Sequence, residues 1–397
     1  MTNPISVIVV GGGYAGVVAA NRLQHQSGVR VTLVNPRSQF VERIRLHQLV
    51  AGTDDATVDF AGLLGERVEL VVDGVTRIDA PARRVDLASG AALSYDYLVY
   101  AVGSTGAVPG GVPGAAQFAH ALAELEQAKQ LRARLHDVPL SAPIVLVGGG
   151  LTGVEAAAEL AEAGRSVTLV GDALAPSVAE SGRRSLRKAL DTLGVTIIDG
   201  PAAMVAGVTA ESVELSDGRS LPSAVTVWTA GFGVPGLAAA SGLTTDTAGR
   251  LLTDETLTSV DDPRIVAAGD AAAPSGLPLR MSCQAAMPLG VQAAQTVLAR
   301  IAGTQPAEIN QAFTGQCISV GRRAGTVQLA HPDDSPRRTY LGGRVAALVK
   351  EQVCRLTVAS MRREARKPGA VFYFKSDWRR ERLAALAQQN QRPVPVR

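Results

Sequence analysis

Two stretches of the chain share one pattern of hydrophobic and polar positions. In each stretch, a short apolar run at 7–10 or 144–147 is followed by a glycine-rich turn, an alanine-rich segment and a second apolar run at 31–34 or 167–170. Uninterrupted runs of β-branched and aliphatic residues are typical of parallel strands that are covered on both faces. The pattern therefore predicts two strand–turn–helix–strand units, and with them an α/β fold built from two Rossmann-like domains.

Two further segments have the spacing of amphipathic helices. Segment 121–135 carries a stripe of leucine and alanine, which we interpret as a packing helix. Segment 342–356 also predicts a helix, and its apolar side consists of Val345, Leu348, Val349, Val353 and Leu356.

Composition narrows the class of protein. Hydrophobic residues make up 46% of the 397 residues and charged residues 19%, which is typical of a globular chain with two or three domains. The net charge of +3 gives no argument for a nucleic-acid partner. The three cysteines and five histidines lack metal-ligand or disulfide spacing, so we expect no metal site and a reducing compartment. We also expect neither a signal peptide nor a membrane-spanning helix, because no basic region precedes an apolar stretch and no apolar run is long enough.

The glycine-rich turns carry the first chemical signal. Gly11, Gly13 and Gly16 have the spacing GxGxxG, and Gly148, Gly150 and Gly153 repeat it. In dinucleotide-binding units the first glycine allows the tight turn, the second lets the backbone approach a pyrophosphate, and the third lets helix and strand pack closely. A pair of ordinary glycine-rich turns is the alternative. The strands that flank both copies favour two dinucleotide sites.

The strand ends after these turns depart from the usual pattern. A carboxylate about 20 residues beyond the glycines normally accepts hydrogen bonds from the ribose hydroxyls. Here Asn35 and Gly171 follow the second strands. The amide oxygen of Asn35 can still accept, and Asp172 lies one position after Gly171. Asp172 is therefore either a ribose ligand or a solvated loop residue.

Later motifs resemble a known family. Gly269-Asp270 follows the second glycine repeat, and the segments ending at Ser104 and Gly233 read LVYAVGS and VWTAGFG. With the two glycine turns, these motifs resemble the pyridine nucleotide-disulfide oxidoreductase-like flavoproteins, which have two dinucleotide-binding domains. The resemblance implies FAD and NAD(P)H as cofactors. It implies a discontinuous FAD domain at 1–110 and 232–305, an inserted NAD(P)H domain at 111–231, and a C-terminal acceptor-site region at 306–397. The cofactor-binding residues that it implies are Gly11, Gly13, Tyr14, Ala15, Gly16, Asn35, Arg43, Gly103, Gly148, Gly150, Gly153, Asp172, Gly231, Gly269, Asp270 and Gln284.

Other segments indicate how electrons leave the flavin. The redox motif CxxxxC of disulfide reductases is missing after the first unit. Instead, RIRLHQLVAG and the tetrapeptide TGVE are similar to segments of type II NADH:quinone oxidoreductases and apoptosis-inducing-factor-like quinone reductases. The resemblance implies catalytic roles for Glu155 of TGVE, for Gln284 and for Lys350. Cys283 and Pro288 replace two residues of the relatives' quinone motif around Gln284. A helix-terminal carboxylate stabilised by the helix dipole is the plainer interpretation of Glu155.

The C-terminal region is basic. Residues 337–382 contain thirteen Lys and Arg against four Asp and Glu. Basic amphipathic segments suit anionic lipid, and the resembled reductases use this region to reach a membrane surface. A solvated basic face packed on the FAD domain is the alternative. We therefore expect a cytoplasmic protein with peripheral membrane association left open, and the sequence leaves the oligomeric state open as well.

The function that these features predict is an FAD-dependent NAD(P)H oxidoreductase with a quinone-like acceptor. We expect the acceptor between Gln284, segment 43–47 and the helix around Lys350. Two alternatives stay open at this point: a reductase of a small iron–sulfur protein, and a flavin redox sensor with slow turnover. The choice between NADH and NADPH also stays open.

Overall fold

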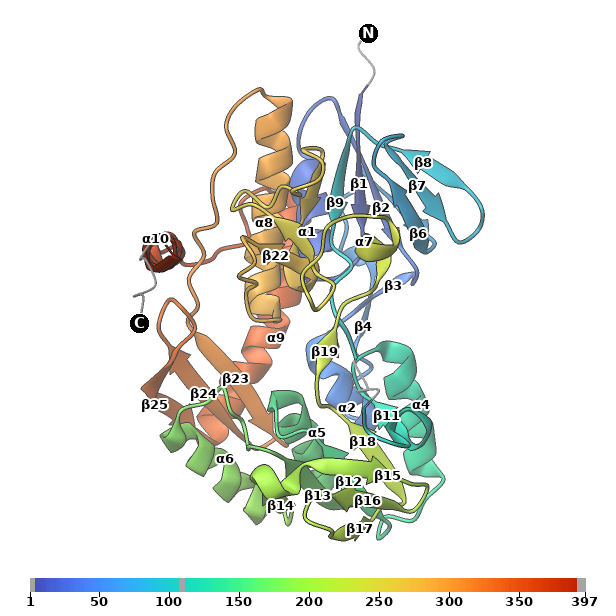
Figure 1. Ribbon diagram of the computed structural model, residues 1–397, viewed down its shortest axis with the longest axis vertical. Helices are drawn as coiled ribbons and strands as arrows, with labels where there is room; N and C mark the ends of the chain where they lie inside the picture. The colour runs from blue at the N-terminus through green and yellow to red at the C-terminus, as the bar shows by residue number, and fades with distance from the viewer. Residues whose placement is uncertain (1–3, 107–110, 391–397) are drawn as a thin grey trace, which may run out of the picture.

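The computed structural model describes residues 4–106 and 111–390, and it contains two five-stranded parallel sheets in separate lobes (Figure 1). The first sheet has the order β21 (Ile265–Ala267), β9 (Tyr97–Tyr100), β1 (Ile5–Val10), β2 (Val29–Asn35) and β5 (Val68–Val72). The second has the order β11 (Ala119–Ala121), β18 (Val225–Trp228), β12 (Pro143–Val147), β13 (Ser166–Gly171) and β14 (Thr196–Asp199). The predicted α/β class with two Rossmann-like units is confirmed.

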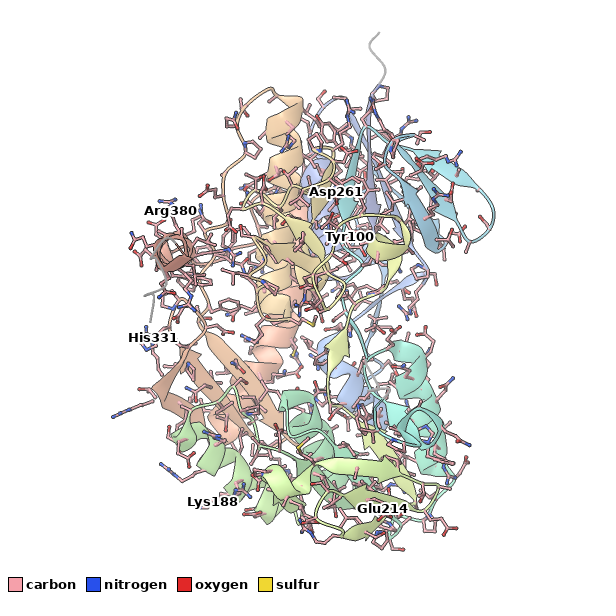
Figure 2. All side chains as sticks on the ribbon, viewed as in Figure 1. Tyr100, Lys188, Glu214, Asp261, His331 and Arg380 are labelled. Carbon is pink, nitrogen blue, oxygen red and sulfur yellow. The ribbon has the colours of Figure 1, made fainter. Side chains whose placement is uncertain are left out.

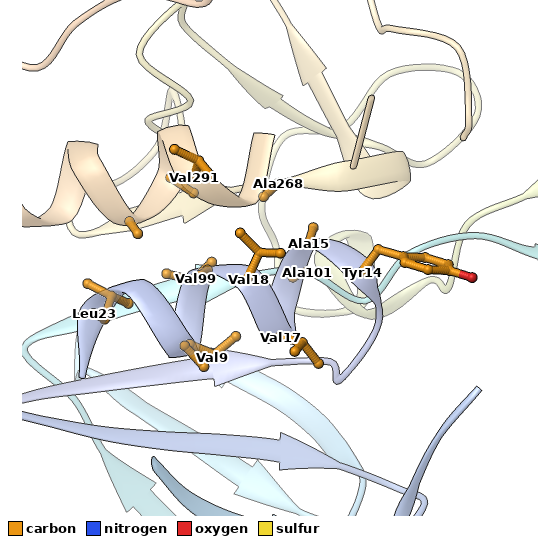
Figure 3. Packing of buried hydrophobic residues seen from close by; sticks show 14 of the residues in the cluster. Val9, Tyr14, Ala15, Val17, Val18, Leu23, Val99, Ala101, Ala268 and Val291 are labelled. Carbon is orange, nitrogen blue, oxygen red and sulfur yellow. The ribbon is translucent and has the colours of Figure 1, made fainter. Parts of the chain in front are cut away.

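Both faces of the first sheet are covered, as its apolar runs predict. Val7 and Val9 of β1 face a core made with α1 (Tyr14–Leu23) and α8 (Cys283–Ile301). Figure 3 shows Val18 of α1 directed toward Val291 of α8, on the side of α1 away from the strands. Ile8 and Val10 point the other way, into a core shared with β6 (Val75–Asp79), β7 (Arg84–Leu87) and β8 (Ala92–Ser94). Alternate residues of one strand therefore enter two different cores.

The second sheet repeats this plan. Ile144 and Leu146 of β12 face the helices α4 (Leu125–His136) and α5 (Leu151–Glu162). Val145 and Val147 face the antiparallel strands β15 (Val205–Val208), β16 (Ser212–Leu215) and β17 (Ser220–Pro222). Helix α6 (Glu180–Thr192) flanks the same lobe. The short helix α2 (Leu46–Ala51) packs into this core as well, although it precedes the second lobe in sequence.

Two short antiparallel strands join the lobes. They are β10 (Thr105–Gly106) and β19 (Phe232–Gly233), which pair where the predicted hinge segments end. Part of the predicted connection at 106–114, residues 107–110, lies outside the described residues. The domain boundaries themselves stay a prediction.

The C-terminal region consists of an antiparallel sheet and two helices. The sheet contains β23 (Gly315–Val320), β24 (Ala324–Ala330) and β25 (Pro336–Gly342), and it is followed by α9 (Gly343–Arg366) and α10 (Trp378–Asn390). Helix α9 runs from this sheet to the first lobe, where the amide of Asn21 donates to the carbonyl of Met361. In Figure 2, Tyr100 lies inside the first lobe, while Lys188 of α6 and Arg380 of α10 lie at the periphery.

Smaller elements complete the chain. They are β3 (Gln39–Val41), η1 (Arg43–Arg45), β4 (Thr57–Asp59), η2 (Phe60–Gly62), α3 (Ala115–Phe118), η3 (Pro201–Ala203), α7 (Leu237–Ala240), β20 (Leu251–Thr253), η4 (Gly269–Ala271) and β22 (Ala272–Pro274). Among the described residues, no helix is long and apolar enough to cross a membrane.

Two helix predictions need correction. The helix predicted for 121–135 starts only at Leu125, because residues 119–121 join the second sheet as an edge strand. The C-terminal helix is longer than predicted, and its C-terminal half packs on α1 of the first lobe, where Val358 and Met361 enter the first core. Val345, Leu348 and Leu356 are 56%, 65% and 54% exposed, whereas Lys350 on the opposite side is buried. The buried side of α9 combines Lys350 and Glu364 with apolar residues such as Cys354 and Met361.

Candidate functional site

The first glycine turn has the geometry of a dinucleotide-binding loop. Gly11 has φ +102°, where only glycine is relaxed, and a Cβ at Gly16 would lie 1.9 Å from the carbonyl oxygen of Gly11. Gly13 differs from both, because a Cβ added there would meet nothing within 4 Å. The first and third glycines therefore serve the turn itself, and the second leaves open space in front of the helix N-terminus.

That open space is part of a cleft at the carboxyl end of the first sheet. The cleft holds about 1320 Å³ of empty space, partly open to solvent. Its lining includes nine of the predicted cofactor residues: Gly11, Gly13, Tyr14, Ala15, Asn35, Arg43, Gly103, Gly269 and Asp270. Gly16 lies behind the loop, and Gly231 and Gln284 are not part of the lining. Ligands of open α/β sheets bind at this end of the strands.

Asn35 does not stand free at the end of β2. Its Oδ1 accepts from the backbone N–H of Gly12 at 2.9 Å, and its Nδ2 donates to the carbonyl of Arg37 at 2.7 Å. The predicted alternative ribose acceptor thus braces the glycine loop. One lone pair of Oδ1 stays available to a ligand.

A polar chain crosses the floor of the cleft. Arg43 donates to the backbone carbonyl of Ser104 and, at 3.0 Å, to its hydroxyl, which in turn donates to Asp270 at 2.7 Å. Burial lowers the pKa of Arg43, and the Asp270 carboxylate opposes that effect. Ser104 was missing from the predicted site residues, although the hinge motif that ends at Ser104 pointed to it.

The second glycine turn has nearly the same backbone geometry as the first. Gly148 has φ +120°, a Cβ at Gly153 would lie 2.0 Å from the carbonyl oxygen of Gly148, and a Cβ at Gly150 would meet nothing within 4 Å. Beside this turn, a shallow pocket is lined by Asp172, Glu180 and the arginines of α6. These arginines have acidic partners: Glu180 pairs with Arg183 at 3.3 Å and with Arg184 at 3.2 Å, and Asp199 pairs with Arg187.

Glu155 and Lys350, both predicted as catalytic, meet in a buried ion pair. Their Oε1 and Nζ atoms lie 3.0 Å apart, and Lys350 also donates to the carbonyl of Cys317 at 3.3 Å. Burial alone would lower the pKa of Lys350, but the Glu155 carboxylate outweighs it and raises that pKa. Burial likewise opposes ionisation of Glu155, yet Lys350 holds the pKa of this carboxyl below its usual range. The pair is therefore ionised at neutral pH.

Two further side chains, Ser319 and His47, lie beside Glu155 of this pair. Ser319 donates to Glu155 Oε1 from its backbone N–H at 2.9 Å and from its hydroxyl at 3.1 Å. Nδ1 of His47 lies 3.9 Å from Glu155, and burial lowers the pKa of His47 to about 4, so the ring is neutral at pH 7. Segment 43–47 pointed to His47, whereas no sequence signal linked Ser319 to Glu155.

A second cavity gives access to the pair from solvent. Lys350 and Ser319 line it together with Gln48, Arg323 and Arg344. Its empty space is about 840 Å³, partly open to solvent.

The structure does not bring all predicted acceptor residues to one wall. Arg43 lines the first cleft and Lys350 lines the second cavity. Nε2 of Gln284, at the N-terminus of α8, donates to Thr314 at 2.6 Å, while its buried Oε1 lacks a partner among the described residues. Over the same residues, no group of three or more His, Cys, Asp or Glu is arranged to hold a metal ion.

Comparison with known proteins agrees with this geometry. A family model described as pyridine nucleotide-disulphide oxidoreductase matches residues 5–297. An NADH dehydrogenase-like protein of Mycobacterium tuberculosis is 33% identical over 323 residues, which are 74% of this chain and 80% of that protein. The type II NADH:quinone oxidoreductase of the same organism is 29% identical over 350 residues, covering 76% and 74% of the two chains. NDH2 of Plasmodium falciparum, solved in complex with NADH, has the same fold, with a TM-score of 0.74 at 16% identity over 93% of this chain and 100% of that one.

The family match spans both glycine turns, the hinge strands and Gly269-Asp270, so the resemblance inferred from sequence is confirmed. The chain belongs to the pyridine nucleotide-disulphide oxidoreductase family, and it is an NADH dehydrogenase-like oxidoreductase that uses FAD and NAD(P)H.

Proposed function

We propose that the first cleft holds FAD, that the second glycine turn receives NAD(P)H, and that electrons then pass to a quinone-like acceptor. The observation that carries this proposal is the open space at Gly13 and Gly150, each in front of a helix N-terminus at the carboxyl end of a parallel sheet. Free backbone N–H groups and the helix dipole favour a pyrophosphate there. The Arg43–Ser104–Asp270 chain supplies polar groups for the rest of a bound FAD.

FAD with NAD(P)H supplies hydride and electron transfer, and the remaining work falls to this chain's residues. Glu155 and Lys350 sit where α5 of the second lobe, β23 and α9 meet, between the glycine turn and the second cavity. Lys350 Nζ keeps its proton at neutral pH and lines that cavity. It can therefore donate a hydrogen bond and oppose negative charge that develops on an acceptor oxygen. Gln48 and Ser319 provide further polar groups in the same wall.

The outward face of α9 supports contact with an anionic lipid surface. Val345, Leu348 and Leu356 are exposed on the same side as Arg344 and Arg355, by the helical period. Amphipathic helices with basic flanks bind membranes that carry negative lipid. A lipid-dissolved quinone would reach the second cavity from this side, because Leu348 and Arg344 also line that cavity.

Separate half-reactions test the catalytic part. The purified protein should carry releasable FAD, and stopped flow should show its reduction by NADH. Lys350→Ala should leave that step nearly unchanged and slow reoxidation by a soluble quinone by tenfold or more, and Gln284→Ala should act the same way more weakly. If Lys350→Ala instead slowed the reduction of FAD and left its reoxidation unchanged, the acceptor would not bind beside Lys350. Turnover only after addition of a ferredoxin would favour the iron–sulfur alternative.

Vesicle flotation tests the lipid part. The protein should float with vesicles of phosphatidylglycerol and phosphatidylcholine and stay behind with phosphatidylcholine alone. Leu348→Glu with Leu356→Glu should abolish flotation, whereas Met204→Glu, an equally exposed apolar site at 58% on the second lobe, should not. If the wild type fails to float but elutes as a dimer that the double variant disrupts, the face binds a second copy instead.

A further inference from the structure

Arg37 forms an ionic contact across the mouth of the first cleft. It follows β2 in the first lobe, and it donates to Glu124 and Glu126, which stand at the start of α4 in the second lobe. Nη2 lies 2.9 Å from Glu124 and 2.6 Å from Glu126, and Nε lies 2.7 Å from the other oxygen of Glu126. Arg37 and Glu124 both line the cleft.

This contact continues into the glycine loop and into the hinge. The carbonyl of Arg37 accepts from Asn35, and Asn35 accepts from the N–H of Gly12. On the other side, the hydroxyl of Thr105 in β10 donates to Glu124. A continuous polar chain thus joins the first glycine loop, the cleft mouth and the strand that links the lobes.

The position of this chain of polar contacts suggests which ligand interaction it replaces. At the end of β2, dinucleotide-binding domains usually place a carboxylate that holds the ribose. Here that position is Asn35, an uncharged residue whose Oδ1 already accepts from the Gly12 N–H. A side chain that closes the cleft at the same end can retain a ligand without touching its hydroxyl groups.

We propose that Arg37, Glu124 and Glu126 form a clasp that closes the ribose end of the first cleft and limits the escape of FAD. The proposal rests on the placement of FAD in that cleft. Arg37 is a positioning residue, since it acts by holding the start of α4 over the cleft. The guanidinium lowers the pKa of Glu126, in keeping with a formed contact.

The clasp should affect FAD exchange far more than folding. Arg37 is 31% exposed in its side chain and Glu126 is 57% exposed, and partly exposed ion pairs contribute little to stability. FAD release can be followed after dilution by the rise in flavin fluorescence. Arg37→Ala should release FAD about fivefold faster than the wild type, which is the upper end for such a contact, with an unchanged melting temperature of the FAD-free protein. Arg219→Ala removes an exposed ion pair to Asp217 away from the cleft and should change release less than twofold.

A double-mutant cycle separates the clasp from unrelated effects of each substitution. Glu126→Gln should also speed release, and Arg37→Ala with Glu126→Gln should release FAD no faster than Arg37→Ala alone. High salt should speed release from the wild type and leave Arg37→Ala unaffected. Release from Arg37→Ala at the wild-type rate, or additive effects in the double variant, overturns the clasp. A wild-type protein that binds no FAD at all would instead overturn the proposed function.

Discussion

The two glycine turns have nearly the same backbone, yet their surroundings differ. The first opens into a cleft lined by residues from both lobes, including Glu124 and Pro235. The pocket nearest the second turn is lined by residues of its own lobe alone, at Asp172 and α6, and none of the turn's glycines lines it. The loop geometry leaves open space at both turns, and under the proposed function the difference in enclosure separates a resident cofactor from one that comes and goes.

One residue of the following helix shows the same division. Val18 of α1 and Glu155 of α5 occupy equivalent positions, two residues after the third glycine. Val18 is fully buried in the apolar core with α8 (Figure 3), whereas Glu155 is buried against Lys350 and Ser319. At this position the first helix is held by apolar packing, whereas the second carries a charge that requires partners.

The largest expected effect comes from removing the partner of that charge. Lys350→Met should destabilise the protein by about 3–5 kcal/mol, because it leaves the Glu155 carboxylate buried without its counterion. The free energy of unfolding in urea measures this loss. Glu155→Gln combined with Lys350→Met should recover part of it, since no unpaired charge remains. Equal stability of Lys350→Met and the wild type would contradict the ion pair.

A smaller effect should appear as pH dependence around the same residue. His47 has a pKa of about 4 in the folded protein, against 6.5 for the free side chain. Between these two pH values the unfolded chain therefore binds more protons than the folded protein. The contribution of His47 to the free energy of unfolding is complete above pH 6.5 and is lost as the pH falls toward 4. The slope should reach at most about 1.4 kcal/mol per pH unit. His47→Gln should flatten unfolding free energy against pH in this window, and His136→Gln, an exposed control, should not. Parallel curves for wild type and His47→Gln would show that the ring is not buried neutral.

The smallest effect concerns the ribose end of the second turn. Asp172 would repel a 2′-phosphate, and the arginines nearby are already paired with acidic residues. We expect kcat/KM to favour NADH over NADPH by less than tenfold, or about 1.4 kcal/mol, and Asp172→Ala to narrow the ratio. Wild-type preference for NADPH by tenfold or more would assign the pocket to a 2′-phosphate.

The local sequence pattern predicted the two lobes, whereas the details of the candidate site depend on contacts between residues that lie far apart in the sequence. The apolar runs and glycine spacing identified both sheets, because each strand–turn–helix unit is continuous in sequence. Asn35 was predicted as a ribose ligand and this stays a prediction, but nothing in the sequence shows that its Oδ1 also accepts from the Gly12 N–H. The sequence predicted an apolar side of α9 but not whether that side faces the protein or the solvent. In the structure Lys350 is buried on the opposite side, and the apolar side faces solvent. Ser319 lies 164 residues from Glu155, and no spacing rule connects them.

The most direct test of the central claim uses the second glycine of each turn. Gly13 and Gly150 have φ of −81° and −67°, which alanine adopts freely, and an added Cβ meets nothing in either place. Gly13→Ala and Gly150→Ala should therefore fold with unchanged stability while each methyl group obstructs a pyrophosphate. We predict that Gly13→Ala is purified without FAD, and that Gly150→Ala keeps FAD but is reduced by NADH only at concentrations at least tenfold higher. Full retention of FAD by Gly13→Ala would contradict the assignment of the first cleft to the resident cofactor.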